Sequence, residues 1–380
     1  MKSLSLVCLL ALFASSCASS PKKSLSDEPK APKAYAFKSK LFKMIHTPIV
    51  GTTVSGQTIK LGGFSGLQYA NEKEDAYFFH TVTDRGPNSE PSGTDRAFLL
   101  PEYSPTVVIL KADLTNMELS VSAEFKLKKK EGTPLTGLPN TRLEENPTDV
   151  FGLYYSVDPQ GLDVEGLVFD GEGGWWVADE YGPSLAHFNQ EGVMLKRLVP
   201  NTNLPRMYAD RRPNRGFEAV ARVENKLYGF LQSPLSKEET FARIAEIDLD
   251  TTKTSAEYFY NFEKGDEKIG DAVAINANTF LVLEQNGKTG DSSQKYIYRI
   301  KIGESDRPVE KTLVADLKNT PFNNFEKIEG LTIIDSKKLA LIYDNDFQVN
   351  GKTNQTTGLT PLDESVNQLM ILEFEEELFL

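Results

Sequence analysis

The stretch that decides the fold is LDVEGLVFDGEGGWWVADEYG, residues 162–182. In it, Glu165 is followed by a small residue and an apolar residue, and this three-residue phrase opens a strand-like run. A glycine-rich turn follows, and a second strand-like run ends in an acidic cluster. The same phrase begins again at Glu218, Asp271 and Glu329, so its starts are 53, 53 and 58 residues apart. A fixed period of this size, made of short strands, is typical of a repeat architecture.

The rest of the chain is written in the same pattern. From Leu41 onward, apolar residues come in short runs bounded by turn residues, as in TVVILKADL (106–114) and KYIYRIKI (295–302). These runs predict strands, and no long amphipathic helix interrupts them. About four strands per period predict an all-β fold of the β-propeller type. An earlier form of the phrase starts at Ser65, and the 340 residues from Leu41 to Leu380 predict six blades, with five or seven as alternatives.

The amino terminus predicts export. Residues 1–16 contain a basic start, a short apolar run and small residues, which is typical of a signal peptide, and the apolar run is too short to span a bilayer. Cys17 follows as in a bacterial lipobox, so we expect a lipid anchor in the envelope, at the outer membrane or in the periplasm; the alternative is ordinary cleavage near Ala18 and secretion. Residues 17–40 are rich in Ser, Pro, Ala and Lys and predict a flexible tether before a domain at 41–380.

Composition excludes several classes of protein. With 39% hydrophobic residues the chain can bury a large core, and with a net charge of −12 it is unsuited to bind nucleic acid. The other cysteine, Cys8, lies in the signal, so the folded domain has no thiol for a disulfide, a nucleophile or a metal site. We expect a monomer without an organic cofactor.

A radial repeat brings equivalent residues together around one axis. If each acid of the phrase opens the innermost strand of its blade, Glu165, Glu218, Asp271 and Glu329 face a common channel. A second rim follows one hairpin later in each blade and consists of Asp84, Arg85, Asp179, Glu180, Gln232, Glu284, Asp344, Asn345 and Asp346. Crowded carboxylates must take up protons, pair with cations or bind a metal ion, and oxygen ligands alone favour Ca²⁺. The alternative is that the acids accept backbone N–H groups and lock neighbouring blades together.

Basic residues accompany these acids. Arg85, Arg215, Arg243 and Lys327 stand in or beside the acidic phrases, where they can form simple ion pairs or hold an anionic substrate. Signals for a nucleophile are weak, because the chain has no G-x-S-x-G elbow. His80 ends a strand and is expected to be structural rather than a general base.

The motifs resemble those of a known family. The strings TVTDRGPN (81–88), LDVEGLVFDGEGGWWVADEYGPSLAHFNQEG (162–192), NRGFEAVA (214–221), IGDAVAI (269–275) and KIEGLTII (327–334) are similar, in this order, to the bacterial phytase-like proteins called "esterase-like activity of phytase". The resemblance implies an exported propeller-like domain with esterase or phosphoesterase activity. The chain departs from the family pattern at Val164, Ala219 and Gln285, and the last departure removes a cation from the rim.

The rims and the resemblance together predict a site for a small anionic ester. The expected catalytic residues are Glu165, Glu180, Asp179, Arg85 and Arg215. The expected substrate-binding residues are Tyr181, Gln232, Arg243 and Lys327. The expected calcium ligands are Asp84, Glu218, Asp271, Glu284, Glu329, Asp344 and Asn345. A non-catalytic propeller that binds a ligand or partner through this face, with structural acids, is the alternative function.

Overall fold

The computed structural model describes residues 34–379 except 142–143, 237–238 and 264–266. The predicted signal peptide, Cys17 and most of the predicted tether therefore lie outside the described residues. Strand β1 (Phe37–Lys43) pairs along its whole length with the last strand, β24 (Gln368–Phe374), so the tether prediction extends too far at its end. In the described part, all helical turns are short 3₁₀ segments, and none has the length and apolarity needed to cross a membrane.

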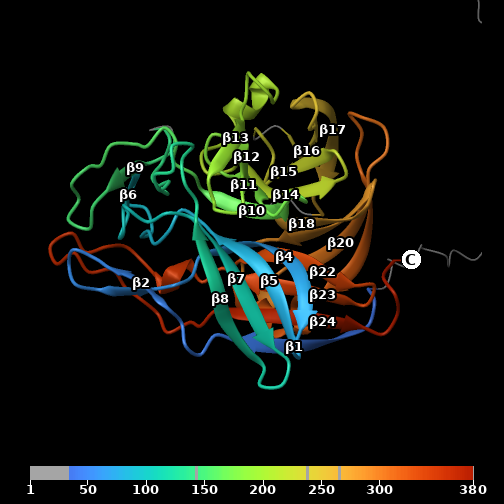
Figure 1. Cartoon of the computed structure of the whole chain (residues 1–380), viewed down its shortest axis with the longest axis horizontal. Coiled ribbons are helices and arrows are strands. Elements are labelled where there is room, and N and C mark those ends of the chain that lie inside the picture. Colours follow the sequence, from blue (N-terminus) through green and yellow to red (C-terminus); the bar gives the residue numbers. More distant parts are fainter. Residues whose placement is uncertain (1–33, 142–143, 237–238, 264–266, 380) are drawn as a thin grey trace, which may run out of the picture. The chain divides into compact units, whose positions relative to one another are not determined.

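The strands form four-stranded antiparallel units, as the all-β prediction required (Figure 1). Blade 1 contains β4 (Phe64–Lys73), β5 (Ala76–Thr83), β7 (Thr106–Asp113) and β8 (Glu118–Lys126). Blade 2 contains β10 (Val164–Phe169), β11 (Trp175–Asp179), β12 (Ser184–Phe188) and β13 (Met194–Leu198). Blade 3 contains β14 (Phe217–Val223), β15 (Lys226–Leu231), β16 (Phe241–Asp248) and β17 (Lys253–Asn261). Blade 4 contains β18 (Lys268–Asn276), β19 (Thr279–Gln285), β20 (Lys295–Lys301) and β21 (Glu310–Asp316).

Blade 5 is built from both ends of the chain. Its inner strands are β22 (Ile328–Asp335) and β23 (Lys338–Tyr343), and β24 and β1 complete it. Strand β1 also touches β8 in parallel through Lys43 and Glu118, which joins blades 5 and 1 into one eight-stranded sheet. Because the amino-terminal strand closes the last blade, the ring is held shut by the pairing of the two chain ends.

The innermost strands form a ring. Strand β4 packs against β10, β10 against β14, β14 against β18, β18 against β22, and β22 returns to β4. The described residues thus make five blades, and the prediction of six is wrong. The extra length lies in long connections at residues 84–105 and 127–163, whose described residues carry only the short paired strands β6 (Asp95–Ala97) and β9 (Asn146–Thr148). A further insertion holds the hairpin of β2 (Ile49–Thr52) and β3 (Thr58–Lys60).

Each blade is covered on both faces by its neighbours. Trp175 and Trp176 are adjacent in β11 and point to opposite faces, yet both are buried. Trp175 packs in a cluster with Val82 of blade 1, whereas Trp176 packs in a cluster with Phe217 of blade 3. This two-sided burial explains why the strand sequences are apolar runs as often as alternating ones.

The small residue of the repeated phrase lets the inner strands approach each other. A Cβ added at Gly166 would lie 3.0 Å from Ala219 Cα, and one added at Gly330 would lie 2.9 Å from Leu67 Cβ. Larger side chains at these positions would push neighbouring blades apart. The acids of the phrase are therefore held beside a tightly packed axis.

Candidate functional site

A β-bulge aims three glutamates at the axis. Glu165, Glu218 and Glu329 are each the unpaired residue where the register of an inner strand shifts against its neighbour. A bulge of this kind redirects a side chain at the end of a pair of strands. All three side chains are buried. The sequence prediction that these positions converge is supported by their shared contacts.

Ser65 connects two of these glutamates. It occupies the position of the repeated acid in blade 1, and its Oγ lies 2.7 Å from Glu165 Oε2 and 3.3 Å from Glu329 Oε2. A hydroxyl has only one proton to donate. If both glutamates were ionised, one of these two contacts would lack a hydrogen.

Glu218 belongs to the same network through an amide. Gln232 Nε2 donates to Glu218 Oε2 at 2.6 Å and to Glu180 Oε1 at 2.9 Å. Lys268 Nζ lies 3.3 Å from Glu329 Oε1 and 3.8 Å from Glu218 Oε1. The acids of blades 2, 3 and 5 are therefore joined into one buried polar network.

Asp163 completes a tight carboxylate group with Glu165 and Glu180. One oxygen from each lies within 4.8 Å of the others, and all three residues are buried. Burial raises the pKa of each carboxyl, and the pKa of Glu165 is raised further by the charges of Asp163 and Glu329. Such a group must hold protons or a cation.

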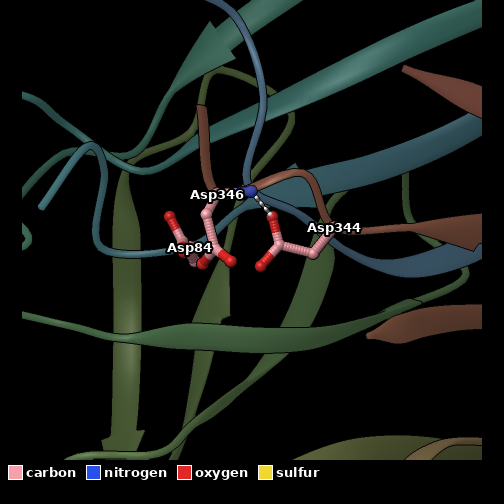
Figure 2. Close-up of side chains that lie close together, drawn as sticks. All are labelled: Asp84, Asp344 and Asp346. Carbon is pink, nitrogen blue, oxygen red and sulfur yellow. Dashed lines mark hydrogen bonds between the residues drawn. The ribbon is translucent and has the colours of Figure 1, made fainter. Parts of the chain in front are cut away.

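A second group contains Asp84, Asp344 and Asp346, and Figure 2 shows their carboxyl groups lying close together. The backbone N–H of Asp346 donates to Asp344 Oδ1 at 2.6 Å, and Lys327 Nζ lies 3.1 Å from Asp344 Oδ2. Burial, followed by the charge of Asp346, raises the pKa of Asp344 to about 8. The amide of Asn345, between the two aspartates in sequence, is buried without a hydrogen-bond partner among the described residues.

The two predicted arginines differ in what they are free to do. Arg85 Nη1 lies 3.0 Å from Glu145 Oε1 and 3.2 Å from Asp163 Oδ2, and the side chain is nearly buried. Arg215 is 41% exposed, its contact with Glu180 is long at 3.5 Å, and its Nη1 also donates to the carbonyl of Asn214. Arg85 therefore holds acids in place, whereas Arg215 can meet a ligand.

A pocket of about 540 Å³ opens beside this network. Its lining includes Arg215, Gln232, Lys268 and Lys327, all of which contact the acids described above. Lys327 was predicted to bind substrate, and its place in this wall fits that role. The pocket thus reaches the side chains that contact the carboxylates at the axis.

Asp271 behaves differently from the glutamates. Its Oδ1 accepts from the N–H of Ala272, and its Oδ2 accepts from the N–H of Leu331, both at 2.7 Å. Leu331 belongs to the next blade, so Asp271 locks blades 4 and 5 together. The structure therefore gives this predicted calcium ligand the alternative, structural role.

Asp179 and Glu284 are also used up in structural contacts. Asp179 Oδ2 accepts from Ser184 Oγ at 2.7 Å and Arg197 Nη2 at 2.8 Å, and its Oδ1 accepts from the N–H of Asp163. Glu284 accepts from the Tyr260 hydroxyl at 2.6 Å and pairs with a lysine. Both carboxyls are fully buried and are engaged by these partners.

Two predicted substrate-binding residues are not among the residues that line the pocket. Arg243 pairs with Glu239 at 2.7 Å and packs over the ring of Phe259 in the outer strands of blade 3. Tyr181 is fully buried, and its hydroxyl donates to the carbonyl of Gly137. We assign both to packing because neither lines the pocket.

Some site residues had no assigned role in the sequence prediction. Lys268 stands three residues before Asp271, as Arg215 stands three before Glu218, so the repeat offset could have identified it. Asp163 lies two residues before Glu165 in the deciding stretch. Glu145 had no such signal, because it reaches Arg85 from a long connection.

Comparison with known proteins places this architecture in a family. Residues 59–347 match the phytase-like family described as esterase-like activity of phytase. An uncharacterized secreted protein of the fungus Arthroderma benhamiae is 25% identical over 309 residues, which cover 63% of this chain and 60% of that protein. The chain thus spans less than two thirds of the length of this relative.

Similar solved structures are distant. A GH43 β-1,3-galactosidase is 14% identical with a TM-score of 0.42, covering 88% of this chain and 60% of its own. The PQQ-bound aldose sugar dehydrogenase of Streptomyces coelicolor is 10% identical with a TM-score of 0.39, covering 91% and 100%. The family match extends over more than half of the sequence and includes every inner strand, so the chain belongs to the phytase-like family described as esterase-like activity of phytase.

Proposed function

We propose that this protein is an exported hydrolase that acts on phosphate or other esters at the acidic axis of the propeller. The observation that carries the proposal is the buried group of Asp163, Glu165 and Glu180, whose carboxylate oxygens converge within 4.8 Å. Carboxyl groups so placed can transfer protons to and from water and a leaving group. The esterase-like description of the family supports this reaction class.

The residues present fit a calcium ion. The donors are carboxylate and amide oxygens, which Ca²⁺ prefers over nitrogen or sulfur. Two buried oxygens in or beside the carboxylate groups, Asp163 Oδ2 and Asn345 Oδ1, accept no hydrogen bond within the described part of the chain. A divalent cation would satisfy such oxygens and favour the ionised form of the crowded carboxyls.

We expect the carboxylates of Asp163, Glu165 and Glu180 to hold the cation. Asp84, Asp344 and Asp346 form a second group of the same kind. Bound calcium would supply Lewis-acid polarisation of an ester oxygen or of water.

The chain's own residues have separable tasks in this proposal. Glu180 accepts a hydrogen bond from Gln232 and faces Arg215. Its carboxyl therefore lies beside the guanidinium group that would hold an anionic ester. Glu165 is fixed by Ser65 and is the second candidate to orient water or accept its proton. Arg215 would stabilise the negative charge that develops on the substrate in the transition state.

Hydrolysis of p-nitrophenyl phosphate, p-nitrophenyl acetate and phytate by the purified protein, with Ca²⁺ or with EDTA, tests the proposal. We expect turnover on at least one ester, its loss in EDTA, and its loss in Glu180→Gln. Absence of turnover on all three esters by the wild-type protein with calcium would refute the hydrolase.

A second candidate is a non-catalytic envelope protein that binds a ligand or partner at this face. Asp271, Asp179 and Glu284 accept hydrogen bonds from neighbouring backbone or side-chain groups. These structural contacts favour the non-catalytic function, because they show that a repeated acid need not be functional. If Ca²⁺ raises the thermal midpoint of the protein but no ester is turned over, the result favours a binding protein in which calcium has a structural role. Ligand in hundredfold excess over Kd stabilises by about 2.7 kcal/mol, which a melting curve resolves.

We further propose that the protein is exported and held in the bacterial envelope by a lipid on Cys17. The lipobox-like residues before Cys17 and the secreted description of the fungal relative support export. Replacement Cys17→Ser should move the protein from the membrane fraction to the soluble periplasmic or secreted fraction, still as a monomer. A Cys17→Ser protein that stays with the membrane would exclude the lipid anchor.

A further inference from the structure

Exposed apolar side chains gather on three turns outside the blades, which we call the three tips. They are residues 53–57 between β2 and β3, residues 150–155 after β9, and residues 353–362 before β24. Large contiguous apolar patches are rare on soluble proteins and mark surfaces that contact a partner or a membrane. Of the nine large hydrophobic residues that the described part of the chain exposes, six lie in the three tips: Val54, Phe151, Leu153, Tyr154, Leu359 and Leu362.

Direct contacts join the three tips into one surface. Ser55 Oγ donates to the carbonyl of Gly358 at 2.7 Å, and Gln57 and Thr360 exchange two hydrogen bonds of 2.8 Å. A Cβ added at Gly358 would lie 2.8 Å from the ring of Phe151 and 2.9 Å from Ser55 Cβ. The connections with β2 and β9 lie together at the left of Figure 1, beside the blades. The exposed residues of the three tips therefore form one patch.

The three tips carry no charge. A quarter of the residues in the chain are Asp, Glu, Lys or Arg, yet none of these stands at 53–57, 150–155 or 353–362. The polar residues there are Ser, Thr, Asn, Gln and Tyr, so the patch can leave water without the cost of desolvating an ion. Tyr154 is 62% exposed, and tyrosine is typical of the interface between a membrane and water.

A cavity of about 620 Å³ continues the apolar surface beside the β2–β3 hairpin. Ile49, Val54 and Leu100 are among its lining residues, and Ile49 and Val54 are 67% and 75% exposed. Glu102, Glu124 and Lys126 also line it, so its wall has no excess of positive charge. Such a cavity can take part of an acyl chain without attracting an anionic headgroup.

We propose that the three tips dock onto a phospholipid bilayer and enter its headgroup layer through apolar contacts. The inference goes beyond ester hydrolysis and uses the proposed lipid on Cys17. The 17 residues from Cys17 to Lys33 can span at most about 60 Å, and β1 then leads to the β2–β3 hairpin. The lipid would thus keep a bilayer within reach of the three tips, which favours a bilayer over a protein as the occupant.

Binding through the three tips alone should be weak and reversible. Stable attachment to a membrane takes two signals, and even one acyl chain gives only marginal binding. A protein without the lipid therefore leaves a washed membrane fraction, as expected for Cys17→Ser, but it should bind vesicles when lipid is in excess. With a net charge of −12, the chain should not prefer anionic lipid.

Co-sedimentation with vesicles of pure phosphatidylcholine measures this binding. The polypeptide from Ala18 onward is used, because it contains all the described residues and carries no lipid. We expect it to bind at millimolar lipid, equally well when salt is raised from about 0.1 M to about 1 M, since apolar contacts are not screened. Adding phosphatidylglycerol to the vesicles should not strengthen the binding.

The triple variant Val54→Ser, Leu153→Ser, Leu359→Ser should bind these vesicles at least about tenfold more weakly, because three aliphatic side chains no longer leave water. Leu153→Ser alone should weaken binding about threefold. Its matched control is Leu195→Ser, which removes a 50% exposed leucine from β13 in blade 2, outside the three tips, and should bind as the wild type does. Melting curves establish folding, and if the triple variant is unfolded, Leu153→Ser and Leu195→Ser decide.

Three results would overturn the proposal. The first is a wild-type polypeptide that stays in solution at millimolar lipid, and the second is equal binding by Leu153→Ser and Leu195→Ser. The third is light scattering that finds a wild-type dimer and a monomeric triple variant, since a second copy of the chain would then cover the three tips.

Discussion

In blade 2 the bulge of the inner strand falls on Glu165, whereas in blade 4 it falls on Gly270, one residue before Asp271. The glutamate is therefore turned out of the sheet ladder and extends toward Ser65 and the acids at the axis. The aspartate stays paired in the ladder, and its shorter side chain remains at the backbone, where it accepts two N–H groups. One repeated phrase thus serves a candidate site in one blade and a structural lock in another.

The second rim shows the same contrast. Glu180 of blade 2 faces a glutamine and a half-exposed arginine, while Glu284 of blade 4 is enclosed by a tyrosine and Lys311. An acid with neutral or exposed partners can exchange protons with a ligand. An acid sealed by a cation and a buried hydroxyl can only hold its neighbours.

The largest effect should appear when Glu180 and Glu284 are each replaced and the two variants are compared. Glu180→Gln removes the proton-transferring carboxyl at nearly constant shape, so we expect kcat to fall by about 10² to 10⁴, the usual range for a general acid or base. Glu284→Gln is the control, and it should keep kcat within about threefold where the protein folds, although loss of the buried ion pair with Lys311 lowers stability. Steady-state kinetics on the preferred ester measures both. Equal losses of kcat in the two variants would contradict the difference between the blades.

The next effect is a loss of stability when Asp271, which connects blades 4 and 5, is replaced. Asp271→Ala leaves the N–H groups of Ala272 and Leu331 buried without acceptors, and we expect a loss of about 3 kcal/mol in the free energy of unfolding, since an orphaned buried donor costs about 1–3 kcal/mol. Glu165→Gln should leave the protein at least as stable as the wild type in EDTA, because burial and nearby acids disfavour its charge. Urea denaturation followed by fluorescence measures both variants. A larger loss in Glu165→Gln than in Asp271→Ala would reverse the assignment.

A smaller effect should appear as a pH dependence of stability. Burial and the charge of Glu329 raise the pKa of Glu218 to about 7, against the opposing effect of Lys268. The folded state then binds this proton more tightly than the unfolded state, so the stabilisation is complete below about pH 4.5, the ordinary value for glutamate, and is lost as the pH rises through about 7.

In EDTA, the thermal midpoint should therefore decline from pH 5.5 to 8.5, and the decline should be smaller in Glu218→Gln. Calorimetric melting at several pH values measures this difference. A variant whose midpoint declines as steeply as that of the wild type would show that Glu218 does not carry this proton.

The smallest effect is expected far from the axis. Arg243→Gln removes a cation that the sequence placed in the substrate site, but the guanidinium pairs with Glu239 and Glu257 in the outer part of blade 3. We expect KM and kcat to stay within about twofold of the wild-type values. A tenfold rise in KM with unchanged melting would return Arg243 to the substrate site.

The sequence predicted the converging acids of the repeat better than the number of blades. The phrase at Glu165, Glu218 and Glu329 predicted inner strands and a converging set of acids, because strand period and repeat spacing are local properties. The number of blades could not be derived from length, since the long connections between β5 and β10 add residues without adding a blade.

What the sequence by itself determined is an all-β repeat of acidic phrases with a leader that is typical of export. What only the tertiary structure decided is which acids extend toward the axis and which are held by hydrogen bonds to the backbone. Whether Glu165 or Asp271 reaches the axis depends on where a bulge falls in the pairing with the next strand, and whether Arg85 or Arg215 is available depends on Glu145 from a distant connection. These are contacts between segments far apart in the chain, and no spacing along the sequence encodes them.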